Sequence, residues 1–151
     1  MKISLKEALY NTCLANIEEK VVIAKALMDN AQKAANQNQK SSAGDKYETN
    51  RAMMQLEKDQ AAMQLSECIK LQKALYTINP KINHKEAHHG SLVTCSTGKF
   101  FISVSIGVVT CEGQDFFCIS PVSPVGKALV GKKSGDLASF NGNEIEVIAV
   151  A

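Results

Sequence analysis

The polar stretch Ser41-Ser42-Ala43-Gly44-Asp45-Lys46-Tyr47-Glu48 decides the fold of this chain, because it separates two long segments with a helical pattern. Residues 5–37 contain neither Gly nor Pro, and their apolar side chains recur at steps of three and four. Residues 46–78 carry a second, less regular apolar series that Pro80 ends. The short connection between the segments predicts an antiparallel two-helix coiled coil.

The ends and faces of these helices can also be predicted. Ser4 followed by Glu7 is typical of a capping box at the start of the first helix. The second helix offers larger apolar side chains, among them Met53, Leu56 and Met63. We expect small Ala side chains of the first helix to face these Met and Leu side chains and to permit close packing.

The pattern changes in the second half of the chain. Residues 79–90 are polar and lack periodicity, which predicts a linker between a hairpin over residues 1–78 and a domain over residues 91–151. Strands are predicted over residues 92–95, 99–106, 107–111, 115–120, 137–140 and 144–150. Ser123-Pro124 predicts the start of a short helix over 125–130, and Asn141-Gly142 predicts a tight hairpin turn. The fold class is therefore α+β, with an antiparallel β domain after the coiled coil.

Composition excludes several classes of protein. The 151 residues include 17 Lys/Arg and 15 Asp/Glu, a balance that does not favour binding of nucleic acid through bulk charge. No run approaches the roughly 18 apolar residues of a membrane helix, and a cytoplasmic protein is expected. The five cysteines are odd in number and never form C-x-x-C, so we expect buried apolar thiols rather than a disulfide framework.

Asp45 and Glu48 are the first candidate site, and two interpretations are open. Asp-x-x-Glu before an apolar series is itself a capping pattern. Residues three apart at a helix start also face the same way, and a pair of carboxylates suits Mg²⁺, which takes one or two of them and keeps its waters. Because two carboxylates do not complete a metal site, the remaining ligands would come from a partner.

Other candidates are less specific. His84, His88 and His89 could bind a transition metal with Cys95, although solvated linker histidines explain the same pattern. Basic residues also gather around the polar interruption, namely Lys33, Lys40, Lys46, Arg51 and Lys58. They are either ordinary solvated helix charges or a local basic surface able to contact phosphates.

A small metabolic enzyme with Cys111 or Cys118 as nucleophile is an alternative of a different class. The chain lacks the G-x-S-x-G, P-loop and G-x-G-x-x-G patterns, so a catalyst acting alone has little support.

The stretch from Ile119 to Asp136, ISPVSPVGKALVGKKSGD, resembles the C-terminal signature of the Gre transcript-cleavage factors. That family shows S-P-hydrophobic-x-x-A-L-hydrophobic-G-K-x-x-G-D before a final β-hairpin. Its architecture is an antiparallel coiled coil followed by an FKBP-like domain. Its tip motif, G-D-x-x-E-N, is matched by Gly44, Asp45 and Glu48.

The resemblance implies a monomeric accessory factor rather than an enzyme. In the family the coiled coil enters the secondary channel of bacterial RNA polymerase, where the two tip acids help to hold a Mg²⁺ ion and promote cleavage of backtracked RNA. Carried over, these acids are Asp45 and Glu48, with Mg²⁺ bound only jointly with the polymerase. Lys40, Lys46 and Arg51 would contact the partner or the RNA 3′ end.

The chain also departs from the family pattern. Thr49 stands where the family has Asn, Asn50-Arg51-Ala52 replaces its A-E-Y stretch, and residues 1–14 do not match its usual start. Some relatives occupy the channel and regulate transcription without cutting RNA. A non-cleaving regulator of RNA polymerase is therefore the alternative.

Overall fold

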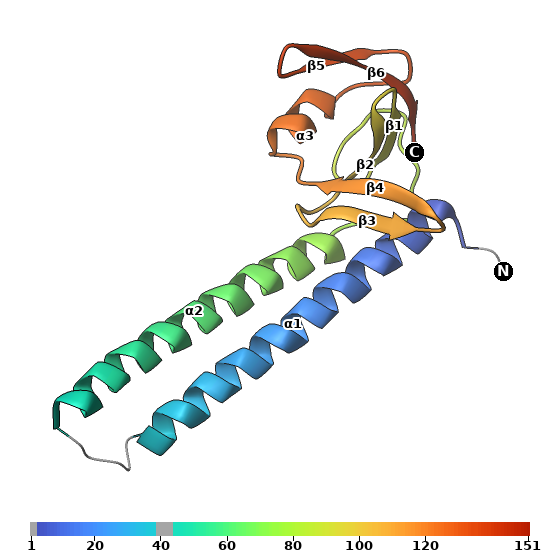
Figure 1. Cartoon of the computed structure of the whole chain (residues 1–151). Helices are drawn as coiled ribbons and strands as arrows, with labels where there is room; N and C mark the ends of the chain where they lie inside the picture. The colour runs from blue at the N-terminus through green and yellow to red at the C-terminus, as the bar shows by residue number, and fades with distance from the viewer. Residues whose placement is uncertain (1–2, 39–43) are drawn as a thin grey trace. The chain divides into compact units, whose positions relative to one another are not determined.

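The computed structural model describes residues 3–38 and 44–151, and the chain divides into two compact units (Figure 1). One unit is Asn16–Gln72, and the other combines the start of the chain up to Ala15 with Lys73–Ala151. The elements, in chain order, are α1 (Leu5–Asn38), α2 (Gly44–Tyr76), β1 (Leu92–Cys95), β2 (Gly98–Ile102), β3 (Gly107–Cys111), β4 (Gln114–Ile119), α3 (Pro124–Leu129), β5 (Leu137–Phe140) and β6 (Asn143–Val150).

The two predicted long helices are confirmed. Helix α1 has 34 residues and α2 has 33, and the predicted cap is present because the Glu7 N–H donates to Ser4 Oγ at 3.2 Å. In the unit formed by residues 16–72 the buried apolar residues are Ile17, Val21, Ala24, Ala61 and Cys68. The turn was expected near residues 38–45, of which residues 39–43 lie outside the described part of the chain.

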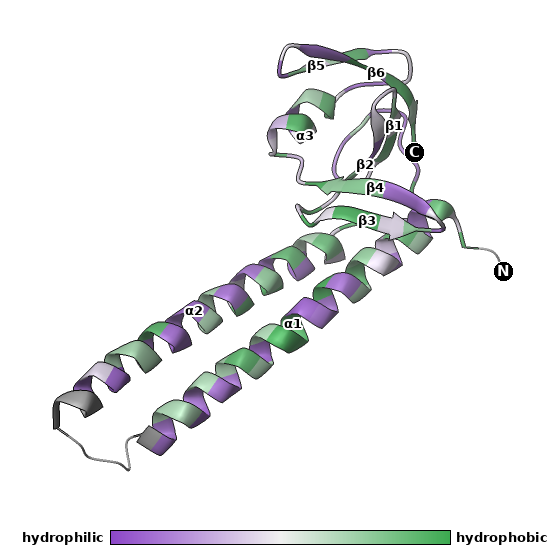
Figure 2. Ribbon diagram, in the orientation of Figure 1, coloured by the Kyte–Doolittle hydropathy of each residue, from purple (hydrophilic) through white to green (hydrophobic). Residues whose placement is uncertain are grey.

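The expected burial of the large apolar side chains on α2 is confirmed at Leu75, which is fully buried, but it is wrong for three others. Met53, Leu56 and Met63 are 57%, 58% and 68% exposed, whereas the small residues Ala61 and Cys68 are buried. Green and purple segments alternate along both helices (Figure 2). On α1 the buried apolar residues Ile17, Val21 and Ala24 recur at steps of four and three, as on an amphipathic helix. Between Met53 and Cys68, therefore, the buried positions of α2 carry small side chains and three of the larger apolar ones are exposed.

The β domain contains one six-stranded sheet with the order β3-β4-β2-β1-β6-β5. Four pairings are antiparallel as predicted, but β2 and β4 are parallel, with Phe101 opposite Cys118. The chain leaves β2, forms β3 at the edge of the sheet, and then returns as β4 into the space beside β2. This hairpin return makes a parallel pair without a crossover helix.

The strand predicted over residues 99–106 is shorter than expected, since β2 ends at Ile102. Ser103 and Val104 are buried but outside the strand, and the Ser103 N–H donates to the Ile119 carbonyl at 2.7 Å. The alternating apolar pattern of residues 99–106 correctly predicts that Val104 is buried. The strand nevertheless ends at Ile102, because the chain then turns away to form β3 at the edge of the sheet.

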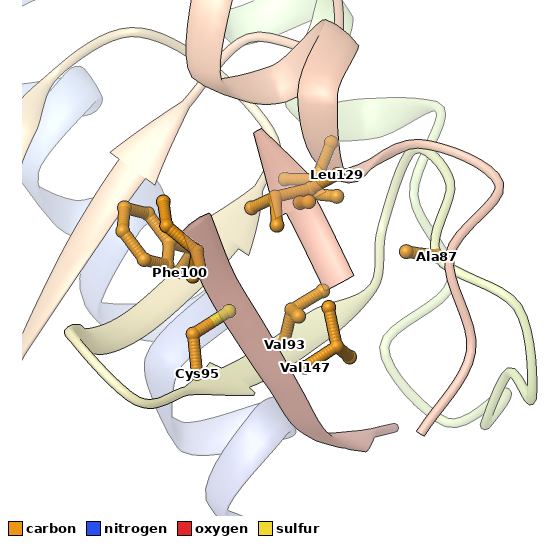
Figure 3. Packing of buried hydrophobic residues seen from close by; sticks show 9 residues of the cluster. Ala87, Val93, Cys95, Phe100, Leu129 and Val147 are labelled. Atoms are coloured by element: carbon orange, nitrogen blue, oxygen red, sulfur yellow. The ribbon is translucent and has the colours of Figure 1, made fainter. Parts of the chain in front are cut away.

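The core of the β domain includes a residue from the segment expected to be a linker. Ala87 is fully buried, its N–H donates to the Lys132 carbonyl at 2.8 Å, and its carbonyl accepts from the Gly131 N–H at 2.7 Å. The buried cluster, shown in Figure 3, consists of Ala87, Val93, Cys95, Phe100, Ile102, Leu129, Ala138, Ile145 and Val147. The polar segment 79–90 therefore also contributes to packing.

The local turn and cap signals are confirmed. Ser123 caps α3, because its Oγ accepts from the Gly126 N–H at 3.1 Å, and Pro124 occupies the first turn. Asn141 and Gly142 have φ values of 52° and 76°, which a tight hairpin between β5 and β6 requires. In the described part of the chain, no helix is long and apolar enough to cross a membrane.

Candidate functional site

The two candidate acids lie at the start of the second long helix. Helix α2 begins at Gly44, so Asp45 and Glu48 occupy its first turns, and the Glu48 side chain is exposed. Backbone N–H groups at a helix start lack partners within the helix and carry partial positive charge, which favours carboxylates there. The placement agrees with both interpretations of these residues, since a capping acid and an acid that binds a metal at the end of a hairpin would both stand at the start of the helix.

Arg51 lies on the same helix face as Glu48. A surface depression is lined by Glu48, Arg51, Ala52 and Gln55, which stand at the i, i+3, i+4 and i+7 positions of one face. Both Glu48 and Arg51 are exposed, so the face presents a carboxylate and a guanidinium side by side. An arrangement of this kind can bind a cation through the acid and a phosphate through the guanidinium.

The remaining members of the predicted contact set are less defined. Lys46 belongs to the first turn of α2, between the two acids. Lys40 lies outside the described residues. The expected contact between these two lysines and a nucleic acid therefore stays a prediction.

Two of the three linker histidines, His84 and His88, are in contact. His84 Nδ1 lies 2.9 Å from Ser91 Oγ, and the His84 and His88 ring centroids are 3.8 Å apart. Burial, then the charges of Lys6 and His88, lower the pKa of His84 below its ordinary value. Within residues 3–38 and 44–151, no three or more His, Cys, Asp and Glu side chains gather as metal ligands, and Cys95 instead packs in the core.

The proposed nucleophiles Cys111 and Cys118 are both buried. Cys118 Sγ lies 3.5 Å from Cys13 Sγ, and Cys111 Sγ lies 3.7 Å from Thr12 Oγ1. All five cysteines are free and buried, which confirms the expectation of apolar thiols without a disulfide framework. These contacts are with a thiol and a hydroxyl rather than a general base, so they give the enzyme alternative no support.

The long signature from Ile119 to Asp136 has structural roles in the β domain. A Cβ atom at Gly126 would lie 2.0 Å from the Ser120 carbonyl oxygen, so only Gly fits there. Asp136 accepts a hydrogen bond from the Lys133 N–H at 2.8 Å and from the Val147 N–H, through its carbonyl, at 2.8 Å. The signature therefore specifies a helix cap, a position where only Gly fits beside a neighbouring carbonyl, and a turn, and it contributes to the fold of the β domain.

No protein-family model matches this sequence, and no curated protein matches it. Among solved structures, the chain is similar to the GreA factor homolog 1 (Gfh1) of Thermus thermophilus, with 16% sequence identity and a TM-score of 0.34. The similarity covers 93% of this chain and 95% of that one.

Proposed function

We propose that this protein binds RNA polymerase and stimulates cleavage of backtracked RNA by presenting Asp45 and Glu48 to the polymerase active site. The observation that carries the proposal is the placement of both acids in the first turns of α2, directly after the break between two helices of more than 30 residues. A helical hairpin can carry side chains at its far end into a narrow channel. The protein would then act as a cytoplasmic monomer that assists a catalyst.

The chemistry of the two acids fits Mg²⁺. Carboxylate oxygens are the ligands that Mg²⁺ prefers, and one or two of them suffice when other ligands come from elsewhere. When bound, Mg²⁺ supplies positive charge that favours attack of water on a phosphodiester. Asp45 and Glu48 would share the ion with ligands of the polymerase.

Cations next to the acids would orient the RNA. Arg51 shares a surface depression with Glu48, and its planar guanidinium suits bidentate contact with a phosphate. Together with Lys46 and Lys40 it would hold the backbone near the RNA 3′ end. The three cations thus position the substrate, and the two acids hold the metal.

The β domain would dock on the outside of the polymerase and contribute affinity. Val108 on β3 and Val122 in the loop before α3 are 55% and 72% exposed, which leaves apolar area for a protein partner. Val108→Ser should therefore weaken polymerase binding by about fivefold, the loss expected for one contributing interface side chain, without reducing cleavage at saturation. Equal affinity of this variant and the wild type would exclude Val108 from the docking surface.

A regulator without cleavage activity is the second candidate. Thr49 follows Glu48 where the Gre pattern has Asn, and Asn50-Arg51-Ala52 changes the next positions. These changes lie next to the two acids in the sequence, so they would affect RNA cleavage more than binding to the polymerase.

A cleavage assay on stalled complexes of the cognate polymerase separates the two candidates. Released RNA fragments that depend on this protein support the cleavage factor. Binding without fragments, at protein concentrations that saturate the polymerase, supports the regulator. Absence of binding overturns both.

A further inference from the structure

Two buried thiols from distant parts of the sequence are in contact. Cys13 of α1 and Cys118 of β4 are 105 positions apart, and their Sγ atoms are 3.5 Å from each other. Their exposed fractions are 0% and 2%. Both belong to the unit formed by the start of the chain and Lys73–Ala151.

The environments of the two thiols differ. The hydrogen bond between the Cys13 and Cys118 thiols lowers the pKa of Cys118, burial opposes this effect, and the Ser103 side chain adds to it. The same hydrogen bond, together with burial, raises the pKa of Cys13. Cys95 has burial alone, which raises its pKa to about 11. Cys118 is thus the thiol of this pair that more readily becomes a thiolate, and Cys13 is poised to react with its product.

We propose that Cys13 and Cys118 form an oxidation site, in which a hydroperoxide converts the thiol pair into a disulfide bond between α1 and β4. The sulfur atoms need to approach by only about 1.5 Å to reach the S–S distance near 2.05 Å. Disulfides of proteins in reducing compartments are usually transient and redox-sensing, so a pair that is reduced at rest fits such a role.

The chemistry proceeds in two steps. The Cys118 thiolate attacks one oxygen of the hydroperoxide, the O–O bond breaks, and the other oxygen leaves as an alcohol after taking a proton. Cys118 is then a sulfenic acid. The Cys13 sulfur attacks the Cys118 sulfur, the S–O bond breaks, and the hydroxyl leaves as water with the Cys13 proton. The two thiols lose two electrons in total, and the hydroperoxide is reduced to an alcohol and water.

Burial sets the rate and the consequence of the reaction. The oxidant reaches the sulfur atoms only when α1 and the sheet separate locally, so oxidation is slower than at an exposed thiol. Once formed, the disulfide closes a very long loop and restricts the unfolded chain. The first turns of α1 can then no longer separate from β4.

The test treats the folded wild-type protein with hydrogen peroxide. The chain has five cysteines. The number of free thiols per chain, titrated afterwards in denaturant, should therefore fall from five by the two that form the disulfide. Digestion without reduction should give one linked peptide pair that contains Cys13 and Cys118. The melting temperature should rise by about 10 °C and return on addition of dithiothreitol.

Two variants control the assignment. Cys95→Ala removes another buried thiol and should still form the linked pair. Cys13→Ala should give no linked pair, no rise in melting temperature, and a Cys118 sulfenic acid that dimedone traps. Because the peptide map is made on the wild type, it stands even where a variant fails to fold. Retention of all thiols in the folded wild type, or a linkage between any other pair, would overturn the proposal.

Discussion

Tyr10 Oη donates a hydrogen bond of 3.0 Å to the carbonyl oxygen of Leu75, which joins α1 to the last turn of α2. The carbonyl also accepts from the Ile78 N–H at 3.0 Å, and the Leu75 side chain is fully buried. A carbonyl oxygen has two lone pairs, so the phenol and the Ile78 N–H together satisfy this acceptor at the end of the helix. The bond ties together the ends of the two helices that belong to the unit with the β domain.

Tyr10→Phe removes this donor and keeps the ring. We expect a loss of about 1 kcal/mol in the free energy of unfolding, measured by urea denaturation. Tyr76→Phe is the matched control, because Tyr76 is 58% exposed and its change should cost less than about 0.5 kcal/mol. Equal effects of the two changes would show that the Tyr10 bond contributes nothing specific.

Asp45→Asn with Glu48→Gln tests the two interpretations of the acids. As metal ligands, they should be needed for cleavage, so the double variant should bind the polymerase normally and lose nearly all released RNA fragments. As caps alone, they should cost at most about 1–2 kcal/mol of stability and leave any cleavage unchanged. Glu57→Gln, an exposed acid further along α2, is the matched control. Higher Mg²⁺ should partly restore the weaker single variant.

Gly126→Ala should destabilise the β domain strongly. The added Cβ would meet the Ser120 carbonyl oxygen at 2.0 Å, so the loop before α3 must shift, at a cost of about 3 kcal/mol or more. Gly107→Ala is the comparison, because its φ is 83° and no atom lies within 4 Å of its Cβ. Backbone strain alone should cost about 1–2 kcal/mol there. A smaller loss at Gly126 than at Gly107 in urea denaturation would contradict this account.

Stability should fall as the pH drops below about 6.5, the ordinary pKa of histidine. Burial first, then Lys6 and His88, lower the pKa of His84 in the folded protein. The unfolded chain therefore takes up a proton before the folded protein does, and protonation favours unfolding. His84→Gln should flatten the dependence of the urea midpoint on pH between about 6.5 and 5. His89 leaves a remaining slope of the same sign, because burial and then His88 lower its pKa too. If the urea midpoint of His84→Gln depended on pH as steeply as that of the wild type, the loss of stability would come from groups other than His84.

Local signals in the sequence predicted the local structure well. The limits of the two long helices, the cap by Ser123, and the turn at Asn141-Gly142 depend on residues within a few positions of each other. Glu48 and Arg51 could be placed on one helix face for the same reason, since helical periodicity determines that face.

Interactions between distant residues could not be predicted in this way. The parallel pairing of β2 with β4 depends on where the β3–β4 hairpin packs in the sheet, which no short segment of sequence specifies. Burial of Ala87 and the contact of Cys13 with Cys118 likewise come from tertiary packing. Met63 shows the converse, because its spacing predicts burial but its side chain is 68% exposed, whereas the smaller Ala61 nearby is buried.

The unit that contains the β sheet is discontinuous along the chain, because residues 16–72 interrupt it. During synthesis its first fifteen residues leave the ribosome long before their partners do. The contact of Tyr10 with Leu75 closes the loop that α1 and α2 form, and so reduces the chain entropy that must be lost when β4 packs against Cys13. The hairpin would thus guide assembly of the rest of the protein, and changes at Ala24 or Ala61 would slow folding of a sheet to which neither residue belongs.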